Sequence, residues 1–259
     1  MDTLELKSVS ERAPPETHFP PESNRLLCEL PEEVKQRIFP HLELVPLELG
    51  QVVCEAGSKQ RYVYFPLDSI ISLLYVMENV MENGASAEIA VVGNDGMVGV
   101  ALFMGGESTT SRAVVQSAGV AYRLFGQRLK DEFNRHDALL HLLLRYSQVL
   151  LTQMAQTAVC NRHHSIEQQL CRWLLLSIDM LPDDRVLMTQ ELIANMLGVR
   201  REGVTDAAGK LQRMGIINYS RGNIEVVDRA LLEQTCCECY TVVRQESERL
   251  MPPQQAQQT

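Results

Sequence analysis

Apolar residues recur at helical spacing in two short segments of the C-terminal third of the chain, and a pair of helices is predicted there. The first helix covers residues 190–197, with Thr189 as its N-cap. Its apolar side chains are Leu192, Ile193, Met196 and Leu197. The second helix begins near Arg200, and its apolar side chains are Val204, Ala207, Ala208 and Leu211. Gly198 lies between them, where a residue without a β-carbon can adopt the left-handed conformation of a tight turn.

Polar side chains occupy the opposite face of the second helix. Two helices joined by a glycine turn, with hydrogen-bonding groups at the start of the second, are typical of a helix-turn-helix that enters the major groove of DNA. Arg201 is expected to contact guanine, and Glu202 is expected to contact cytosine. Arg200, Thr205 and Lys210 are expected to contact phosphates. The alternative is an ordinary helical hairpin with a solvated charged face.

A β-hairpin is predicted directly after the helix pair. Residues 216–219 and 224–227 form its strands, and Arg221 lies in the turn, where it is expected to reach a phosphate. Such a hairpin is the wing of a winged helix-turn-helix. Between Gly198 and Gly222 the chain has five basic and two acidic residues, whereas its net charge is −9, and a basic island of this kind is typical of a DNA-binding surface. The predicted DNA-binding residues are Thr189, Arg200, Arg201, Glu202, Thr205, Asp206, Lys210 and Arg221.

Short runs of β-branched and aromatic residues, separated by glycine-containing turns, fill the region 44–124. The runs are residues 51–54, 61–65, 69–75, 88–92, 112–115 and 120–124. Many short strands spaced in this way predict an antiparallel β-barrel or jelly roll. Before it, residues 24–42 are predicted to be helical, with apolar Leu26, Leu27, Leu30, Val34 and Ile38.

The sequence offers few groups for catalysis. All six histidines lie outside residues 42–135, so a metal site built from inward-facing histidines of the roll is not expected. Neither a nucleophile elbow nor a phosphate-binding GxxxxGK[ST] loop occurs. The chain is therefore not expected to be an enzyme.

A long helix is predicted over residues 137–162. A heptad seam follows it through Leu140, Leu143, Ser147, Leu150, Met154, Thr157 and Asn161. Further apolar residues that widen this face are Leu139, Leu142, Leu144 and Leu151. One side of the helix is therefore expected to pack on the β-roll and the other on a second copy of the chain, and the alternative is burial entirely within one subunit. His163 and His164 follow, and they are expected to be surface residues of a hinge.

Three of the seven cysteines lie close together, at Cys236, Cys237 and Cys239. Residues 228–250 are predicted to form one helix, on which these three positions do not share a face. No fourth ligand is evident nearby in the sequence, so no metal site is predicted. A redox- or metal-responsive regulator that acts through these cysteines is kept as an alternative.

The ends of the chain and the lack of long apolar runs indicate its compartment. Residues 1–24 and 251–259 are polar and contain several prolines or glutamines, so a disordered arm and tail are predicted. No apolar run approaches the roughly 20 residues of a membrane span, and the first residues do not have the pattern of a signal peptide. A cytoplasmic protein without a membrane partner is expected.

The order of helical segment, β-roll, long helix and winged helix-turn-helix resembles the Crp/Fnr family of bacterial transcription regulators. The resemblance covers residues 25–230 and is most specific at residues 189–205, TQELIANMLGVRREGVT, which include the Arg201-Glu202 pair. Residues 50–57, GQVVCEAG, are similar to an early turn of the family's β-roll. The resemblance implies a homodimer that binds a pseudo-palindromic site in double-stranded promoter DNA and contacts RNA polymerase.

The same resemblance places an effector pocket at Gly96, Met97, Ser111 and Arg112. Relatives that bind cyclic AMP have a glutamate for a ribose hydroxyl where Met97 stands, and their phosphate-binding arginine is displaced here by one residue along a strand. Cyclic AMP is therefore not the expected effector, and no cofactor is assigned. Some relatives respond to cyclic di-GMP. Cys28 alone cannot supply the N-terminal cysteine cluster of the iron–sulfur relatives.

Asp206 stands where many relatives have a third base-reading arginine. A protein-interaction module with a degenerate helix-turn-helix is therefore a further alternative. The predicted architecture is an α+β protein with an antiparallel β-roll like a cyclic-nucleotide-binding domain. Its predicted parts are an arm at 1–24, the β-roll sensor domain at 25–136, a dimerisation helix at 137–162, the winged helix-turn-helix domain at 163–250 and a tail at 251–259.

Overall fold

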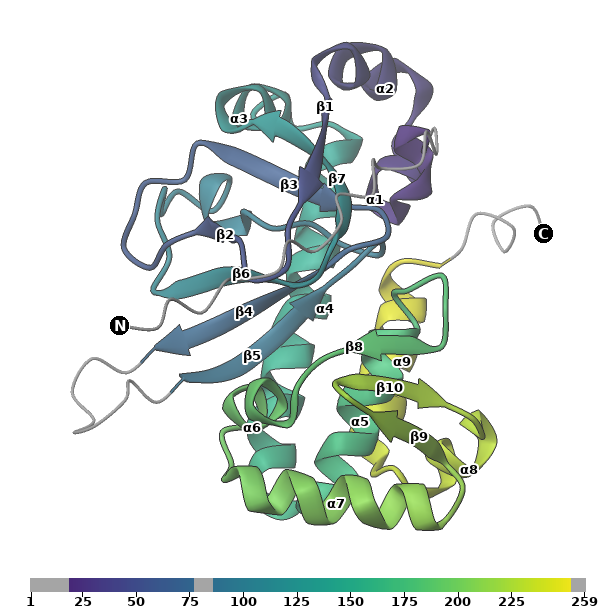
Figure 1. The fold of residues 1–259 in the computed structure, drawn as a ribbon. Helices are drawn as coiled ribbons and strands as arrows, with labels where there is room; N and C mark the ends of the chain where they lie inside the picture. Colours follow the sequence, from purple (N-terminus) through teal and green to yellow (C-terminus); the bar gives the residue numbers. More distant parts are fainter. Residues whose placement is uncertain (1–18, 77–85, 253–259) are drawn as a thin grey trace, which may run out of the picture.

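The computed structural model of the chain describes residues 19–76 and 86–252. A long helix, α4 (Ala138–His163), connects a β-roll to a C-terminal unit of helices and a small sheet (Figure 1). α3 (Gly126–Phe133) leads from the roll into α4, whose N-terminus is capped by the carboxylate of Asp137. The predicted α+β fold is confirmed.

The β-roll consists of two antiparallel sheets. The first has the order β1-β7-β3, formed by Glu43–Leu47, Gly119–Phe125 and Tyr62–Pro66. The second has the order β2-β6-β4-β5, formed by Val52–Cys54, Ser111–Ser117, Ile70–Val76 and Ser86–Val92. All six predicted strand runs are confirmed, and a 3-10 turn at Val100–Leu102 follows β5.

β1 lies outside the predicted runs. It pairs with β7, placing Glu43 opposite Arg123, and these two side chains form an ion pair at 2.7 Å. Of its side chains only Leu47 is fully buried. β1 is defined by its pairing with β7 and buries few side chains, so its sequence has no periodic apolar pattern from which a strand could be predicted.

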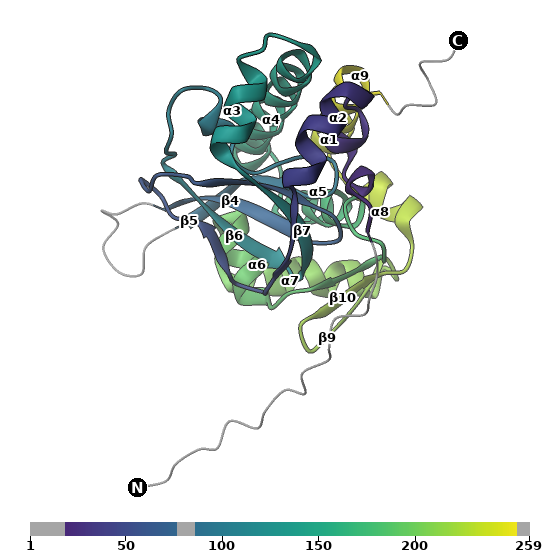
Figure 2. The same ribbon diagram turned by 90° about the horizontal axis from the view of Figure 1, so that it is seen from above.

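The helical segment before the roll is confirmed as two helices rather than one. α1 (Arg25–Cys28) and α2 (Glu32–Ile38) are separated by Pro31, and a 3-10 turn at Phe39–His41 follows. The predicted apolar residues are all buried. Figure 2, the view from above, shows α1 and α2 on one side of the β-roll, and Leu250 at the end of α9 and the following Met251 join the same apolar cluster as these two helices.

The predicted disordered arm and tail fall largely outside the described residues. The innermost residues of both were predicted wrongly, because they pack on the protein. Asn24 is buried, and its amide group donates hydrogen bonds to the carbonyls of Pro66 and Gly96, both at 2.9 Å. Met251 is buried as well.

The C-terminal unit contains a sheet of order β8-β10-β9 surrounded by helices. Its elements are α5 (Ile166–Ile178), β8 (Arg185–Leu187), α6 (Gln190–Leu197), α7 (Arg201–Arg213), β9 (Ile217–Ser220), β10 (Asn223–Val226), α8 (Arg229–Thr235) and α9 (Glu238–Leu250). The prediction of one helix over 228–250 is wrong, because Cys236 and Cys237 are extended, with ψ of 159° and 164°. This break turns α9 back along α4 (Figure 1).

The C-terminal unit packs directly on the β-roll through α6 and β5. At this contact Met196 is buried with its sulfur 3.8 Å from the hydroxyl of Ser72. The same hydroxyl donates a hydrogen bond of 2.6 Å to the carboxylate of Glu88. Burial raises the pKa of Glu88 to about 7, although the bond from Ser72 acts in the opposite direction. A carboxyl group is therefore enclosed where the two units meet.

In the described part of the chain, no helix is both long enough and apolar enough to cross a membrane.

Candidate nucleic-acid interface

α6 and α7 form the predicted helix-turn-helix. The hydroxyl of Thr189 accepts a hydrogen bond from the backbone N–H of Leu192 at 3.3 Å and so caps α6. Gly198 ends this helix in the left-handed conformation, with φ 65° and ψ 32°. Buried Ile193 and Val204 hold the two helices in one core. The predicted geometry of the helix pair is confirmed.

The predicted DNA-contacting side chains lie together on the exposed face of α7 and at its N-cap. They are Arg200, Arg201, Glu202, Thr205, Asp206 and Lys210, and each is exposed. α7 lies along the outer edge of the C-terminal unit, with α6 between it and the β-roll (Figure 1). Among the described residues, Arg200 and Arg201 form no salt bridge, so both guanidinium groups are available to a ligand.

Two of these side chains have partners within the protein. The Thr205 hydroxyl is 2.8 Å from Oε1 of Gln190 on α6, which ties the two helices together. The ammonium group of Lys210 is 2.5 Å from the carboxylate of Glu167 on α5. A phosphate contact by Lys210 would therefore have to replace an existing ion pair.

The predicted wing is formed by β9 and β10. Arg221 and Gly222 both have positive φ, 51° and 80°, so the strands are joined by a two-residue turn of the I′ type. Arg221 is the exposed tip of this turn, and Gly222 is the residue that accepts its conformation at least cost. The Tyr219 hydroxyl fastens the wing by donating to the Met188 carbonyl at 3.2 Å.

The residues assigned to an effector pocket lie in the β-roll, and none of the four lines either cavity described below. Gly96 is pressed against Tyr146, where a β-carbon would lie 2.5 Å from the phenolic oxygen. Met97 is fully buried, and its backbone N–H and carbonyl both bond to the same hydroxyl, at 3.0 and 2.9 Å. Ser111 is buried, whereas Arg112 pairs with Glu55 at 3.2 Å.

A cavity of about 590 Å³ lies instead among α1, α4, α5 and α9. Arg25, Asp95, Tyr146, Gln153 and Arg244 are among the residues that line it. Two nitrogens of the Arg25 guanidinium are buried there without a hydrogen-bond partner among the described residues. A second cavity, of about 410 Å³, lies along β2 and β3 and is lined by Glu55, Lys59 and Arg61, among others.

The heptad seam predicted on α4 faces the inside of its own protomer. Leu143, Ser147, Leu150 and Thr157 are buried by the chain itself, Leu140 and Met154 are half-buried, and Asn161 is exposed. The exposed apolar side chains of α4 are on a different face, and they include Leu144, Leu151 and Val159 at 49, 60 and 47% exposure. The two-sided helix predicted from the sequence is thus present, but its free side is the one that carries Leu144 and Leu151.

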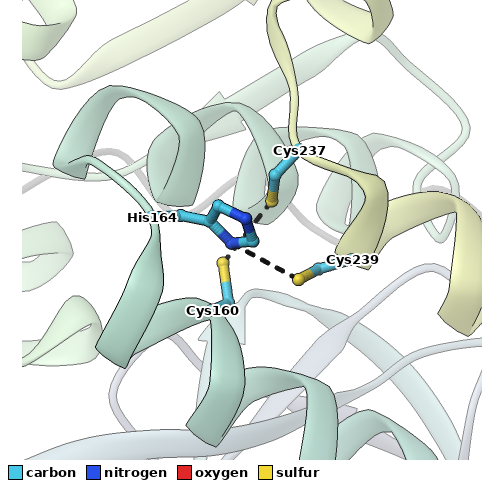
Figure 3. A group of neighbouring side chains, drawn as sticks. All are labelled: Cys160, His164, Cys237 and Cys239. Atoms are coloured by element: carbon cyan, nitrogen blue, oxygen red, sulfur yellow. Dashed lines mark hydrogen bonds between the residues drawn. The ribbon is translucent and has the colours of Figure 1, made fainter.

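The cysteines at the break between α8 and α9 lie beside residues that the sequence does not place near them. Cys237 and Cys239 meet Cys160, in the last turn of α4, and His164, which ends it (Figure 3). His164 is half-buried, so its prediction as a surface residue of the hinge is wrong, whereas His163 is exposed. The sequence signal available was the four-residue spacing of Cys160 and His164 at a helix end.

Hydrogen bonds among these thiols make their pKa values differ. Bonds with the thiols of Cys160 and Cys236 lower the pKa of Cys237. Burial, followed by the proximity of Cys237, raises the pKa of Cys239 to about 11. The arrangement therefore favours a thiolate at Cys237.

Two family profiles match the chain in the order of its structural units. The cyclic nucleotide-binding domain matches residues 44–136, and the Crp-like helix-turn-helix domain matches residues 168–235. No curated protein sequence matches the chain. The fold and the site thus define a transcription regulator with a nucleotide-binding-like roll and a DNA-binding helix-turn-helix.

Solved structures share this architecture. FixK2 from Bradyrhizobium japonicum has a TM-score of 0.61 at 14% identity, with 76% of this chain and 98% of that chain covered. TTHB099, a CRP-family transcriptional regulator from Thermus thermophilus, has a TM-score of 0.60 at 17% identity, covering 74% and 95%. CLP from Xanthomonas campestris, described as a c-di-GMP-responsive global regulator, has a TM-score of 0.59 at 14% identity, covering 76% and 100%. The chain belongs to the Crp/Fnr family of transcription regulators.

Proposed function

We propose that the protein is a homodimeric regulator that binds a specific two-fold symmetric promoter site and is not gated by cyclic AMP. The observation that carries this proposal is the exposed N-terminal half of α7, where Arg200 and Arg201 have no salt-bridge partner among the described residues. The wing tip at Arg221 is exposed in the same unit and supplies a further positive charge. Together they offer one group of side chains for base edges and another for phosphates.

Arg201 is assigned to direct base readout, because a guanidinium can donate two hydrogen bonds to O6 and N7 of guanine. Glu202 can accept a hydrogen bond from N4 of cytosine. Arg200, Arg221 and Thr205 are assigned to the phosphate backbone, where they fix the position of α7 in the groove. Lys210 takes a smaller part because Glu167 already neutralises it.

The second copy is placed on the exposed face of α4. Leu144, Leu151, Ala155, Ala158 and Val159 are exposed, and their spacing of three, four and seven residues puts them on one side of the helix. An apolar stripe along a solvent-facing helix favours burial against an identical stripe, which produces the two-fold symmetry that paired half-sites require. RNA polymerase is proposed as a further partner because the Crp/Fnr resemblance implies it.

Cyclic AMP is not the proposed effector, because the residues at the expected pocket do not offer the groups that would bind its ribose and phosphate. Met97 is fully buried where a ribose-binding acid would be needed, and Arg112 is engaged by Glu55. An effector of another kind has the cavity among α1, α4, α5 and α9 available to it. A ligand there would contact both the long helix and the last helix, and so shift the C-terminal unit relative to the roll.

The test is a salt-titrated gel shift of the purified protein on the DNA upstream of its own gene. Binding that resists a scrambled competitor, with affinity unchanged by cyclic AMP, is the expected result. The same titration with cyclic di-GMP asks whether this effector, named for the Xanthomonas protein, acts here as well. Equal affinity for the upstream and scrambled DNA at every salt concentration would contradict the proposal, because phosphate contacts alone would then explain binding.

A further inference from the structure

We propose that Cys160, His164, Cys237 and Cys239 bind a single zinc ion, which fastens the junction of α4 and α5 to the start of α9. The four side chains come from two segments of the chain and point toward one another (Figure 3). Their ligand atoms all lie within 4.8 Å of one another. This inference does not depend on the proposed function, because zinc content is measured independently of DNA binding.

The distances between the ligand atoms suit tetrahedral coordination. Bonds of about 2.3 Å to sulfur and about 2.0 Å to nitrogen require separations of about 3.8 Å between two sulfurs and about 3.5 Å between sulfur and nitrogen. The Cys160 and Cys237 sulfurs are 3.6 Å apart. The Cys239 sulfur is 3.5 Å from Nδ1 of His164. Three thiolates and one imidazole around a tetrahedral centre are a ligand set typical of structural zinc.

The orientation of the histidine ring supports the same conclusion. Nδ1 faces the cysteines, while Nε2 is 3.4 Å from the carboxylate of Glu238. A histidine that binds zinc through one nitrogen commonly donates its other N–H to a carboxylate, which fixes the ring and its tautomer. The backbone of His164 is also held, since the Gln169 amide donates to its carbonyl at 3.0 Å.

The electrostatic environment is compatible with a negatively charged centre. Three thiolates and one zinc ion carry a net charge of −1. Arg172 of α5 is buried, and one of its nitrogens donates to the Thr157 hydroxyl at 2.6 Å, while its Nε has no hydrogen-bond partner among the described residues. The positive charge of this guanidinium is close enough to interact electrostatically with Cys160 and Cys239.

The position of the site in the chain indicates what the metal would do. His164 is the residue at which the chain leaves α4, and α5 begins two residues later at Ile166. Cys237 is the N-cap of α9, which follows the last helix of the DNA-binding unit. The metal would therefore close a link between the hinge ahead of that unit and the helix that returns along α4. The matched helix-turn-helix domain ends at residue 235, so two of the ligands belong to the segment after it.

The test uses the full chain. Protein freed of metal with a chelator under reducing conditions is titrated with zinc alone, and with cobalt as a spectroscopic probe. We expect about one metal ion per chain and the visible absorption of tetrahedral cobalt–thiolate coordination. Failure of the reduced protein to bind zinc stoichiometrically would overturn the proposal. Purification with iron and the absorption of an iron–sulfur cluster would also overturn it, because the site would then hold a different centre.

Variants locate the ion. Cys239→Ser and Cys160→Ser should each reduce zinc affinity by more than a hundredfold, whereas His164→Cys should keep the metal by restoring a fourth ligand. Glu238→Gln should weaken zinc binding about tenfold. Cys236→Ser is the matched control, since this neighbouring thiol is not one of the four ligands. Equal loss of zinc in Cys236→Ser and Cys239→Ser, with both proteins folded by circular dichroism, would contradict the assignment.

Discussion

The exposed face of α7 and the cluster at the α4–α5 junction are two polar sites on the same C-terminal unit, and they are built in opposite ways. On α7 the charged side chains come from consecutive turns of one helix and are exposed, although Lys210 pairs with Glu167 of α5. At the junction, Cys160 and Cys237 lie 77 residues apart in sequence, and each depends on the position of the others. The first arrangement suits recognition of a long, repeating ligand, and the second suits fixation of the fold. Substitutions on α7 should therefore change DNA binding without changing stability. Substitutions at the junction should primarily change stability.

The largest effect is expected from the loss of the proposed zinc ion. Removing a ligand that is present at about a thousandfold above its dissociation constant lowers the free energy of unfolding by about 4 kcal/mol. Thermal denaturation of chelated and zinc-loaded protein measures this difference. Cys236→Ser should show the same difference as the unchanged protein, and an equal melting temperature with and without zinc would argue against a structural metal.

Loss of the exposed stripe on α4 should come next. Leu151→Glu is expected to weaken dimerisation by about 2–4 kcal/mol, because full burial of a leucine contributes roughly 1.5–3 kcal/mol, Leu151 is 60% exposed before association, and a two-fold interface contains this residue twice. Sedimentation over a range of protein concentrations gives the dimer dissociation constant. Leu187→Glu is the matched control, since Leu187 has a similar exposure of 65% but lies on β8, in the small sheet of the C-terminal unit. If both variants dissociate the dimer, or if neither does, the assignment of α4 to the dimer interface is wrong.

On α7 the effect should be smaller and confined to DNA. Arg201→Ala is expected to cost roughly 1–3 kcal/mol of binding free energy on the specific site and to relax specificity at one base pair. Its melting temperature should be unchanged because Arg201 is exposed. Competition binding with a panel of single-base variants measures both effects. If affinity for specific and random DNA falls equally, Arg201 contacts phosphate rather than a base.

Glu88 tests the contact between the β-roll and α6. Its pKa is raised to about 7 by burial, so its neutral form is favoured in the folded protein. The contribution of Glu88 to the free energy of unfolding is therefore greatest below about pH 4.3, the ordinary pKa of a glutamate. This contribution is lost as the pH rises through 7. Glu88→Gln should therefore raise the free energy of unfolding above pH 7 by on the order of 1–3 kcal/mol and have little effect at pH 4.5. Denaturation at several pH values checks this, and a gain of equal size at low pH would be inconsistent with titration of Glu88.

The smallest effect is expected at Lys210. Its ion pair with Glu167 already satisfies the ammonium group, so Lys210→Ala should weaken DNA binding by less than about 1 kcal/mol. The loss should be similar on all DNA sequences. Glu167→Gln is the partner experiment, and it should strengthen binding slightly by releasing the lysine. A gel shift at low salt resolves both changes, and a loss in Lys210→Ala as large as that in Arg201→Ala would reverse their assigned roles.

The two sites also differ in how far the sequence alone predicts them. The helix pair and its turn are predicted in detail because an N-cap threonine, helical spacing and a glycine are all local signals. The cysteine cluster cannot be predicted in this way, because it forms only when the chain ends α8 at Cys236-Cys237 and α9 returns to the end of α4. Leu143 and Leu150 are also covered by parts of the chain that are distant in sequence, because Leu143 joins the cluster that contains Leu250 and Leu150 joins the cluster of the roll strands. The sequence pattern of α4 alone does not distinguish burial of this kind from burial against a second copy. The strand β1 escapes prediction for the related reason that its pairing with β7, rather than its own pattern, defines it.

Selection of bound sequences from random double-stranded DNA by the zinc-loaded protein, followed by sequencing, would show directly whether α7 reads DNA as part of a homodimer. A homodimer should enrich a motif of two inverted half-sites whose centres lie about one helical turn, or a multiple of it, apart. Arg201→Ala should lose preference at one position in each half-site and keep the spacing. Recovery of no motif, or of a single unpaired half-site, would contradict a homodimer that reads DNA through α7.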